Sequence, residues 1–165
     1  SDRAKTEALL TRMSDTVPGL VIRTTMLVGF PGETVAEFEE LCRFTREFGF
    51  DRLGAFAYSF EKDTSSAGME GHLPEAVKQA RRDRLMEIQQ EVAFARNVAL
   101  VGKTLPSVID RYDTENECFV GRTYGDAPDI DNLVFFKNPD LTPGEFVPAR
   151  VTAALDYDLE AEITR

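Results

Sequence analysis

The first hundred residues alternate between helical and extended hydrophobic patterns. Apolar positions recur at helical spacing in three segments, 3–16, 34–48 and 74–100. Two shorter runs, 20–28 and 52–60, lie between these segments, and the first of them is almost wholly apolar. Such a run is typical of a parallel strand that is covered on both faces. The order of the segments therefore predicts a strand–helix–strand unit with a right-handed crossover.

Short local signals mark where these helices begin and end. Thr34 and Glu37 have the spacing of a capping box at the start of the second helix, and Gly49 suits its C-cap. Pro74 suits the first position of the long third helix. The first helix has a narrow apolar side formed by Ala8, Leu9 and Met13. Two parallel strands cannot close a core by themselves, so this half is expected to belong to a larger α/β sheet or barrel whose other strands lie upstream of residue 1.

The pattern changes after Gly102 to short extended runs separated by turn residues. These runs cover residues 104–111, 117–124, 133–137, 145–153 and 155–163. Short strands at this spacing predict a five-stranded antiparallel barrel of OB-like size. The predicted fold class is therefore α/β followed by all-β, with a boundary near residues 98–103.

Composition and charge narrow the class of protein. The chain has 165 residues, of which 42% are apolar, and this excludes a wholly disordered protein. No apolar run approaches the ~20 residues of a membrane span. Two cysteines are too few for a disulfide framework, so the expected location is the cytoplasm.

The charge is unevenly distributed between the two halves. Residues 1–98 contain 13 Lys and Arg against 16 Asp and Glu, a balance of −3. Residues 99–165 contain 6 against 13, a balance of −7. This excess of acid argues against a protein that holds nucleic acid mainly by charge.

The turn after the first strand is the strongest candidate for a ligand-binding site. Gly29-Phe-Pro-Gly-Glu-Thr34 follows a parallel strand, at the end where α/β folds bind ligands. Glycines let a ligand approach the backbone, and the helix N-terminus that follows offers free N–H groups. A tight turn with nothing bound is the alternative interpretation, since short motifs also occur by chance.

Alternation along the first strand places Arg23, Thr25 and Leu27 on one face, which ends at Gly29. An arginine on a covered strand needs a partner, because an unpaired buried charge is very costly. The predicted partner is either a polar ligand in a barrel lumen or a carboxylate outside this chain.

Three other polar features have more than one interpretation. The loop Asp126-Ala-Pro-Asp-Ile-Asp131 is a solvated turn, a cation site or a surface that docks a basic protein. His72, the only histidine, lies in a polar loop and is expected to be exposed. A basic cluster on the long helix is a solvated helix face or a contact with RNA or the ribosome. The cluster consists of Lys78, Arg81, Arg82 and Arg84.

Several of these segments together resemble one enzyme family. The segment from Arg23 to Thr34, RTTMLVGFPGET, is similar to the fifth-strand segment of radical S-adenosylmethionine methylthiotransferases. Tyr58-Ser59 matches the motif of their next strand, and Arg84–Gln90 resembles the helix that closes their catalytic domain. The barrel from about residue 99 resembles their C-terminal TRAM domain. Further motifs resemble the branch that methylthiolates an aspartate β-carbon of a small-subunit ribosomal protein. These are Gly121-Arg-Thr, the loop 126–131 and Asp156-Tyr-Asp-Leu159.

The resemblance implies a division of the chain and a set of roles. Residues 1–98 would be the C-terminal part of a parallel, TIM-like radical S-adenosylmethionine barrel, and residues 99–165 a TRAM domain. The residues implied to lie beside the adenosine end of S-adenosylmethionine are Arg23, Thr25, Leu27 and Gly29. The residues implied to contact the substrate are Asp126, Asp129 and Asp131.

The chain also departs from the family pattern. The family's CxxxCxxC motif is absent, and Cys42 and Cys118 cannot replace it. The resemblance thus implies two 4Fe–4S clusters and S-adenosylmethionine in a full-length enzyme. For this chain alone it implies no bound cofactor, no metal ligand, no catalytic residue and no activity. Asp63 stands where the family usually has a glycine, so that loop is expected to differ in shape.

The charge of the barrel bears on the choice of substrate. A barrel with a balance of −7 repels phosphates and attracts a basic protein. We therefore predict that the partner is a basic small-subunit ribosomal protein, with weak or no RNA binding and no membrane contact. The alternatives are an enzyme that methylthiolates a tRNA adenosine and a non-catalytic binding module that contains a TRAM barrel.

Overall fold

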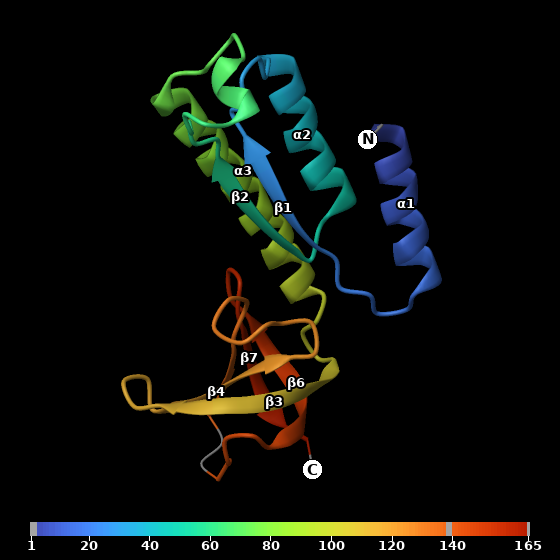
Figure 1. Ribbon diagram of the computed structural model, residues 1–165. Helices are drawn as coiled ribbons and strands as arrows, with labels where there is room; N and C mark the ends of the chain where they lie inside the picture. Colours follow the sequence, from blue (N-terminus) through green and yellow to red (C-terminus); the bar gives the residue numbers. More distant parts are fainter. Residues whose placement is uncertain (1–2, 138–139, 165) are drawn as a thin grey trace.

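Helices and strands alternate through the first half of the chain in the predicted order. The computed structural model describes residues 3–137 and 140–164 (Figure 1). The elements of the first half are α1 (Arg3–Thr16), β1 (Arg23–Val28), α2 (Val35–Phe48), β2 (Arg52–Ala57), the 3₁₀ turn η1 (Ser65–Gly68) and α3 (Glu75–Val98). Both strands are shorter than the runs 20–28 and 52–60 predicted for them, because the parallel ladder between them has only six residue pairs.

The predicted ends of α2 are confirmed. Thr34 Oγ1 accepts a hydrogen bond from Glu37 N (3.2 Å), and the Glu37 carboxylate accepts one from Thr34 N (2.8 Å), which completes the capping box. Hydrogen bonds from the Thr34 backbone N–H and from the Thr34 hydroxyl (2.7 Å) lower the pKa of the Glu37 carboxyl. Gly49 ends the helix in the left-handed region with φ +68°. Pro74 is the N-cap of α3 rather than its first helical residue, so the helix begins one residue later than predicted.

One face of the β1–β2 sheet packs beneath α2 and α3. Val28 and Leu53 supply the sheet side of this core, and Phe38 of α2 and Leu85 of α3 cover it. The strands are parallel, with Arg23 paired to Arg52 and Val28 to Ala57, so neighbouring partners in the register point to the same face. The first half therefore has its own hydrophobic core on one side of the sheet.

The other face of the sheet is open. Leu27 and its register partner Phe56 lie on it and are 51% and 61% exposed, and Thr25 beside them is also exposed. The prediction that the first strand is covered on both faces is wrong, because α2 and α3 both pack against the opposite face.

Helix α1 has its predicted bounds but not its predicted packing. Leu9 and Met13, on the expected apolar side, are exposed, and the helix has no buried residue. Leu10 instead packs at the edge of the first core, and Arg3 forms an ion pair with Glu40 of α2. Figure 1 shows α1 beside α2, at the margin of the first half.

The second half is a closed five-stranded barrel. Its strands are β3 (Thr104–Asp113), β4 (Cys118–Thr123), β5 (Val134–Phe136), β6 (Phe146–Ala154) and β7 (Leu159–Ile163), in the order β3-β4-β5-β7-β6. The predicted number of strands is confirmed, but the barrel is not wholly antiparallel, because β5 and β7 pair in parallel. An odd number of strands cannot alternate in direction all the way around a closed barrel, so closure requires one parallel pair.

The barrel has a core separate from that of the first half. Ile109, Val134, Phe136 and Val151 are among its buried members. A Cβ on Gly121 of β4 would lie 2.2 Å from the Val108 carbonyl oxygen, so only glycine allows β3 and β4 to approach this closely. Each half of the molecule therefore packs around its own apolar cluster. Within residues 3–137 and 140–164, no helix combines the length and apolar character needed to cross a membrane.

Candidate functional site

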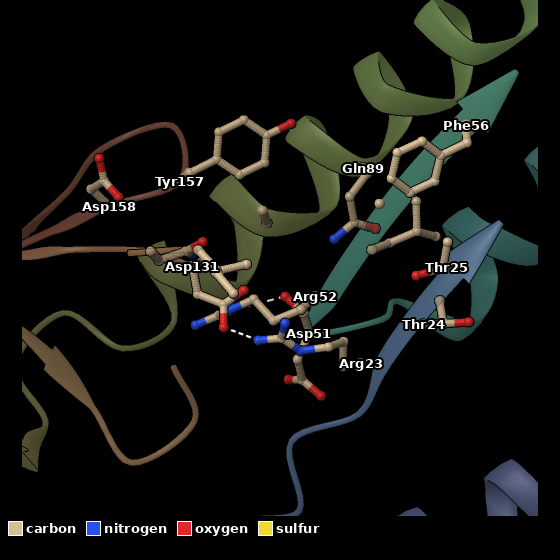
Figure 2. Close-up of a pocket in the computed structure, with 15 residues that line it drawn as sticks. Arg23, Thr24, Thr25, Asp51, Arg52, Phe56, Gln89, Asp131, Tyr157 and Asp158 are labelled. Atoms are coloured by element: carbon tan, nitrogen blue, oxygen red, sulfur yellow. Dashed lines mark hydrogen bonds and ion pairs between the residues drawn. The ribbon is translucent and has the colours of Figure 1, made fainter. Parts of the chain in front are cut away.

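The open face of the β1–β2 sheet and the adjoining barrel loops enclose a cavity of about 410 Å³. Figure 2 shows Phe56 and Gln89 at one end of this cavity, Arg23, Arg52 and Asp131 in its middle, and Tyr157 and Asp158 at the other end. The Gln89 side chain is buried, and its Nε2 donates to the Phe50 carbonyl (3.1 Å). Its Oε1 has no hydrogen-bond partner among the residues that the structure describes. Both halves of the chain thus contribute charged and apolar side chains to one cavity.

Arg23 lies at the end of the open face nearest the barrel. Its guanidinium forms an ion pair with Asp131, whose carboxylate also accepts a hydrogen bond from Ala127 N (2.7 Å). The prediction that the Arg23 partner is a ligand in a lumen or a carboxylate outside the chain is wrong, because the partner belongs to the second half of the same chain. Arg23 is 45% exposed, so its charge is not deeply buried.

Arg52, the register partner of Arg23, forms a second bridge to the same loop. Its Nε donates to Asp126 Oδ1 (2.8 Å), and its Nη2 contacts the same oxygen. Its Nη1 donates to the backbone carbonyl of Asp51 (2.8 Å). The Asp126 side chain is 1% exposed, and its other oxygen accepts a hydrogen bond from the Thr123 hydroxyl. This ion pair is therefore largely shielded from water, unlike that of Arg23.

The opposite, C-terminal end of the strands has its own polar network. The Glu33 side chain accepts a hydrogen bond from Gly29 N (3.0 Å) and forms an ion pair with Arg81. Lys78 Nζ donates to the Tyr58 carbonyl (2.8 Å). Gly29 has φ +75°, and a Cβ there would lie 2.5 Å from the Lys78 side chain. These contacts favour the interpretation of the turn as tight and internally bonded, because the Gly29 N–H already has a protein acceptor.

The basic cluster of α3 does not form a free cationic surface. Lys78 and Arg81 are buried and point toward the end of the sheet, and this contradicts the prediction of a solvated face or an RNA contact for these two residues. They precede the buried Leu85 by seven and four positions, so all three lie on the same helical face. Arg82 pairs with Asp83, and Arg84 pairs with Glu39.

The Tyr58-Ser59 motif lies just beyond β2. The Tyr58 ring packs edge-on against Phe30 (5.4 Å between centroids), and its hydroxyl donates to Ser66 Oγ (2.9 Å). His72 is exposed, as predicted, with its ring 5.3 Å from that of Phe60. Asp63 is exposed and has no positive φ, so its backbone does not require a glycine.

The four residues predicted to lie beside S-adenosylmethionine are spread along β1. Thr25 and Leu27 share the open face with Gly54 and Phe56. Arg23 and Gly29 lie at opposite ends of the strand, about 20 Å apart at the usual rise of a strand. The structure therefore brings Thr25 and Leu27 to one exposed surface, whereas Arg23 and Gly29 contact other parts of the chain.

The three predicted substrate-binding aspartates also differ among themselves. Asp126 forms an ion pair with Arg52, and Asp131 forms one with Arg23. Asp129 is exposed and has φ +59°, a conformation that aspartate tolerates better than most residues. Only Asp129 of the three presents its carboxylate to solvent.

The two cysteines do not fit an iron–sulfur cluster. Cys42 is buried in the core of the first half, and Cys118 is buried in the barrel. Burial raises the pKa of both thiols, whereas a metal ligand must be a thiolate. Among the described residues there is no group of three or more His, Cys, Asp or Glu that could hold a metal ion.

Comparison with known families assigns the second half. The family description "TRAM domain" matches residues 101–164, which include all five strands of the closed barrel. Residues 101–164 are a TRAM domain. The predicted TRAM barrel is therefore confirmed, and the loop that binds Arg23 and Arg52 belongs to it.

Curated relatives match both the first half and the TRAM domain. The chain is 44% identical over 156 residues to the ribosomal protein uS12 methylthiotransferase RimO of Syntrophotalea carbinolica, covering 94% of this chain and 34% of that protein. It is 42% identical over 160 residues to the protein of that name from Desulfitobacterium hafniense, covering 96% and 36%. The corresponding protein of Cytophaga hutchinsonii is 41% identical over 166 residues, covering 99% and 38%. The chain thus spans about a third of the length of the curated relatives it matches, and the predicted resemblance to the ribosomal-protein branch is confirmed.

Sequence reasoning missed several residues that join the first half to the TRAM domain. Arg52 has the same signal as Arg23, a cation at the start of a strand, and this signal could have identified it. Asn97, whose Nδ2 donates to the Tyr157 carbonyl (2.8 Å), had no such signal. Tyr124, whose hydroxyl donates to the Gly19 carbonyl (3.0 Å), had none either.

Proposed function

We propose that this chain is part of a radical S-adenosylmethionine methylthiotransferase that modifies an aspartate of ribosomal protein uS12. The observation that carries the proposal is the match of both halves to relatives of that name, at 41–45% identity. In this enzyme residues 1–98 are the C-terminal part of the radical domain, and residues 99–165 are the TRAM domain. The two separate hydrophobic clusters support this division.

The first half contributes one wall of the site where the chemistry takes place. When bound, S-adenosylmethionine would supply the methyl group and, with electrons from a reduced iron–sulfur cluster, would activate a carbon–hydrogen bond of the substrate, and a second cluster would supply the sulfur. The open face offers a bound cofactor the Thr25 hydroxyl and the apolar surface of Leu27 and Phe56. The cluster ligands are supplied from outside this chain, since its two thiols are buried apart in different cores. Accordingly, the chain alone has no methylthiotransferase activity.

The TRAM domain contributes the surface that recognises the substrate. Residues 99–165 have a balance of −7, which favours a basic protein over RNA. Asp126 and Asp131 are neutralised within the chain, so the acidic surface available to uS12 comes from other carboxylates. Glu115 and Glu117 in the β3–β4 turn and Asp129 are exposed and form no ion pair within the described ranges. We infer that these three carboxylates contribute to the contact with uS12.

Product analysis by mass spectrometry tests the proposed reaction. The full-length enzyme, with its clusters reconstituted, should add a methylthio group to an aspartate of uS12 in the presence of S-adenosylmethionine and a chemical reductant. The same enzyme should leave tRNA unmodified, and the 165-residue chain should yield no product. A methylthiolated tRNA adenosine, or turnover by this chain alone, would contradict the proposal.

A substitution on the open face tests where the cofactor lies. In the full-length enzyme, Leu27→Asp should weaken S-adenosylmethionine binding, because it places a charge on the proposed apolar wall. Val35→Asp is the matched control, since Val35 is 69% exposed on α2 and does not belong to the sheet. Equal affinities in wild type and Leu27→Asp, measured by equilibrium dialysis, would refute the assignment of Leu27.

A further inference from the structure

Several polar contacts cross the junction between the first half and the TRAM domain. The first hydrophobic cluster includes no residue beyond Ile88, and the fully buried members of the second begin at Ile109. Between the clusters lie the cavity of about 410 Å³ and a second one of about 380 Å³. Asp51, Arg52 and Asn132 line both cavities. The two clusters share no buried residue, so specific polar contacts contribute to the relative orientation of the two halves, beside the packing of Val21 against Gly125.

The Arg52–Asp126 pair is the more buried of the two ion pairs that cross the junction. The Arg52 guanidinium is held on two sides, by Asp126 Oδ1 and by the Asp51 carbonyl, and Asp126 is held in turn by Thr123. The planar guanidinium makes all these bonds in one fixed geometry, which a lysine cannot reproduce. The Arg23–Asp131 pair reinforces this bridge from the more exposed side of the cavity.

Direct hydrogen bonds complete the junction around this ion pair. Tyr124 donates to the Gly19 carbonyl (3.0 Å) at one side. At the other side Asn97 donates to the Tyr157 carbonyl (2.8 Å), and Gln90 donates to Asp156 (3.0 Å). All of these bonds run between the first half and a loop of the TRAM domain.

We propose that Arg52 and Asp126 are positioning residues that fix the TRAM domain relative to the open face of the sheet. The loop 126–131 is then a structural support at the junction. Its main role is to orient the TRAM domain rather than to bind the substrate. This rests on the proposed function in one respect, namely that the TRAM domain holds the substrate and the open face holds the cofactor. A fixed angle between them would bring the substrate carbon to the reacting position.

Residual dipolar couplings of the 165-residue chain test the orientation directly. In the wild type, amide couplings from both halves should fit one alignment tensor. Asp126→Asn and Arg52→Lys should each cause the halves to require different tensors, and Arg52→Lys leaves no uncompensated charge at Asp126. Arg150→Gln is the control, because it removes an ion pair to Glu162 that lies within the barrel. A common tensor retained in either junction variant that stays folded would refute the proposal.

Kinetics of the full-length enzyme then separate positioning from binding. Asp126→Asn should lower kcat with uS12 by roughly tenfold to a hundredfold, the effect of a displacement of about 1 Å. The KM for uS12 should be unchanged, and Arg150→Gln should alter neither constant. Unchanged kcat together with separate tensors would refute the role in catalysis. Modification of tRNA instead of uS12 would refute the proposed function while leaving the orientation result intact.

Discussion

The two halves of the molecule bury the apolar faces of their sheets in different ways. The TRAM domain closes five strands on themselves, so every strand has two neighbours and Phe136 is completely buried. The first half has two parallel strands covered on one face only, which leaves Leu27 and Phe56 exposed on the other. A closed barrel has no free sheet edge, whereas a two-stranded sheet has two.

This difference separates a barrel whose strands are all paired on both sides from a sheet with one uncovered face. The barrel needs no further element to pair its strands. The open face of the first half is the kind of surface that further strands, a cofactor or both would cover. Beside that face, the loop that follows β4 lines the cavity with three residues, Ile130, Asp131 and Asn132.

A large-to-small substitution in the barrel core should have the largest effect. Phe136→Ala should lower the free energy of unfolding of the TRAM domain by about 3–5 kcal/mol, because it leaves a cavity in a closed core. Phe146→Ala, at a position that is 82% exposed, should change it by less than about 0.5 kcal/mol. Urea denaturation followed by near-ultraviolet circular dichroism provides the comparison. Equal losses for the two variants would show that the barrel core is not organised as described.

The capping box of α2 should have an intermediate effect on the first half. Thr34→Ala removes the side-chain acceptor for Glu37 N and should cost about 1 kcal/mol of stability. Hydrogen exchange should show faster opening at the start of α2, with no change in the barrel amides. Faster exchange in both halves would mean that the two cores unfold as one unit and are not independent.

The alkaline pH dependence of stability should show a smaller effect at the junction. Burial, with a further contribution from the charge of Asp156, raises the pKa of Tyr157. Over the pH range between its unfolded and folded pKa values, the folded state keeps a proton that the unfolded state has lost. The stability from this group is therefore complete below the ordinary tyrosine pKa and is lost as pH rises through the folded value. Tyr157→Phe should flatten the decline of unfolding free energy above about pH 10, and an unchanged slope would contradict this cause.

Local sequence signals predicted where the helices begin and end better than they predicted what packs against them. The capping box at Thr34 and the C-cap at Gly49 predicted the ends of α2, because the atoms involved lie within one turn of each other. The parallel β5–β7 pair was missed, since strand direction in the barrel follows from closure and not from any single run. Helix α1 was predicted with its bounds, but its exposed Leu9 and Met13 show that an apolar stripe does not determine what covers it.

The site was predictable only where the sequence places residues on one strand. Alternation correctly put Thr25 and Leu27 on one face, but it could not show that this face is open. The partners of Arg23 and Arg52 depend on how two separately packed halves are oriented, and no pattern within either half contains that information. The inward direction of Lys78 and Arg81 was available from their helical spacing to Leu85.

The most direct test of the central claim is the binding preference of the 165-residue chain, measured by isothermal titration calorimetry with purified uS12 and with bulk tRNA. We expect saturable binding to uS12 that weakens as salt rises, and no saturable binding to tRNA. The double variant Glu115→Gln/Glu117→Gln should weaken uS12 binding. The control Glu160→Gln/Glu162→Gln alters the net charge equally but removes carboxylates already paired with Lys137 and Arg150, so it should have little effect. Tight, salt-sensitive binding to tRNA without binding to uS12 would contradict the account.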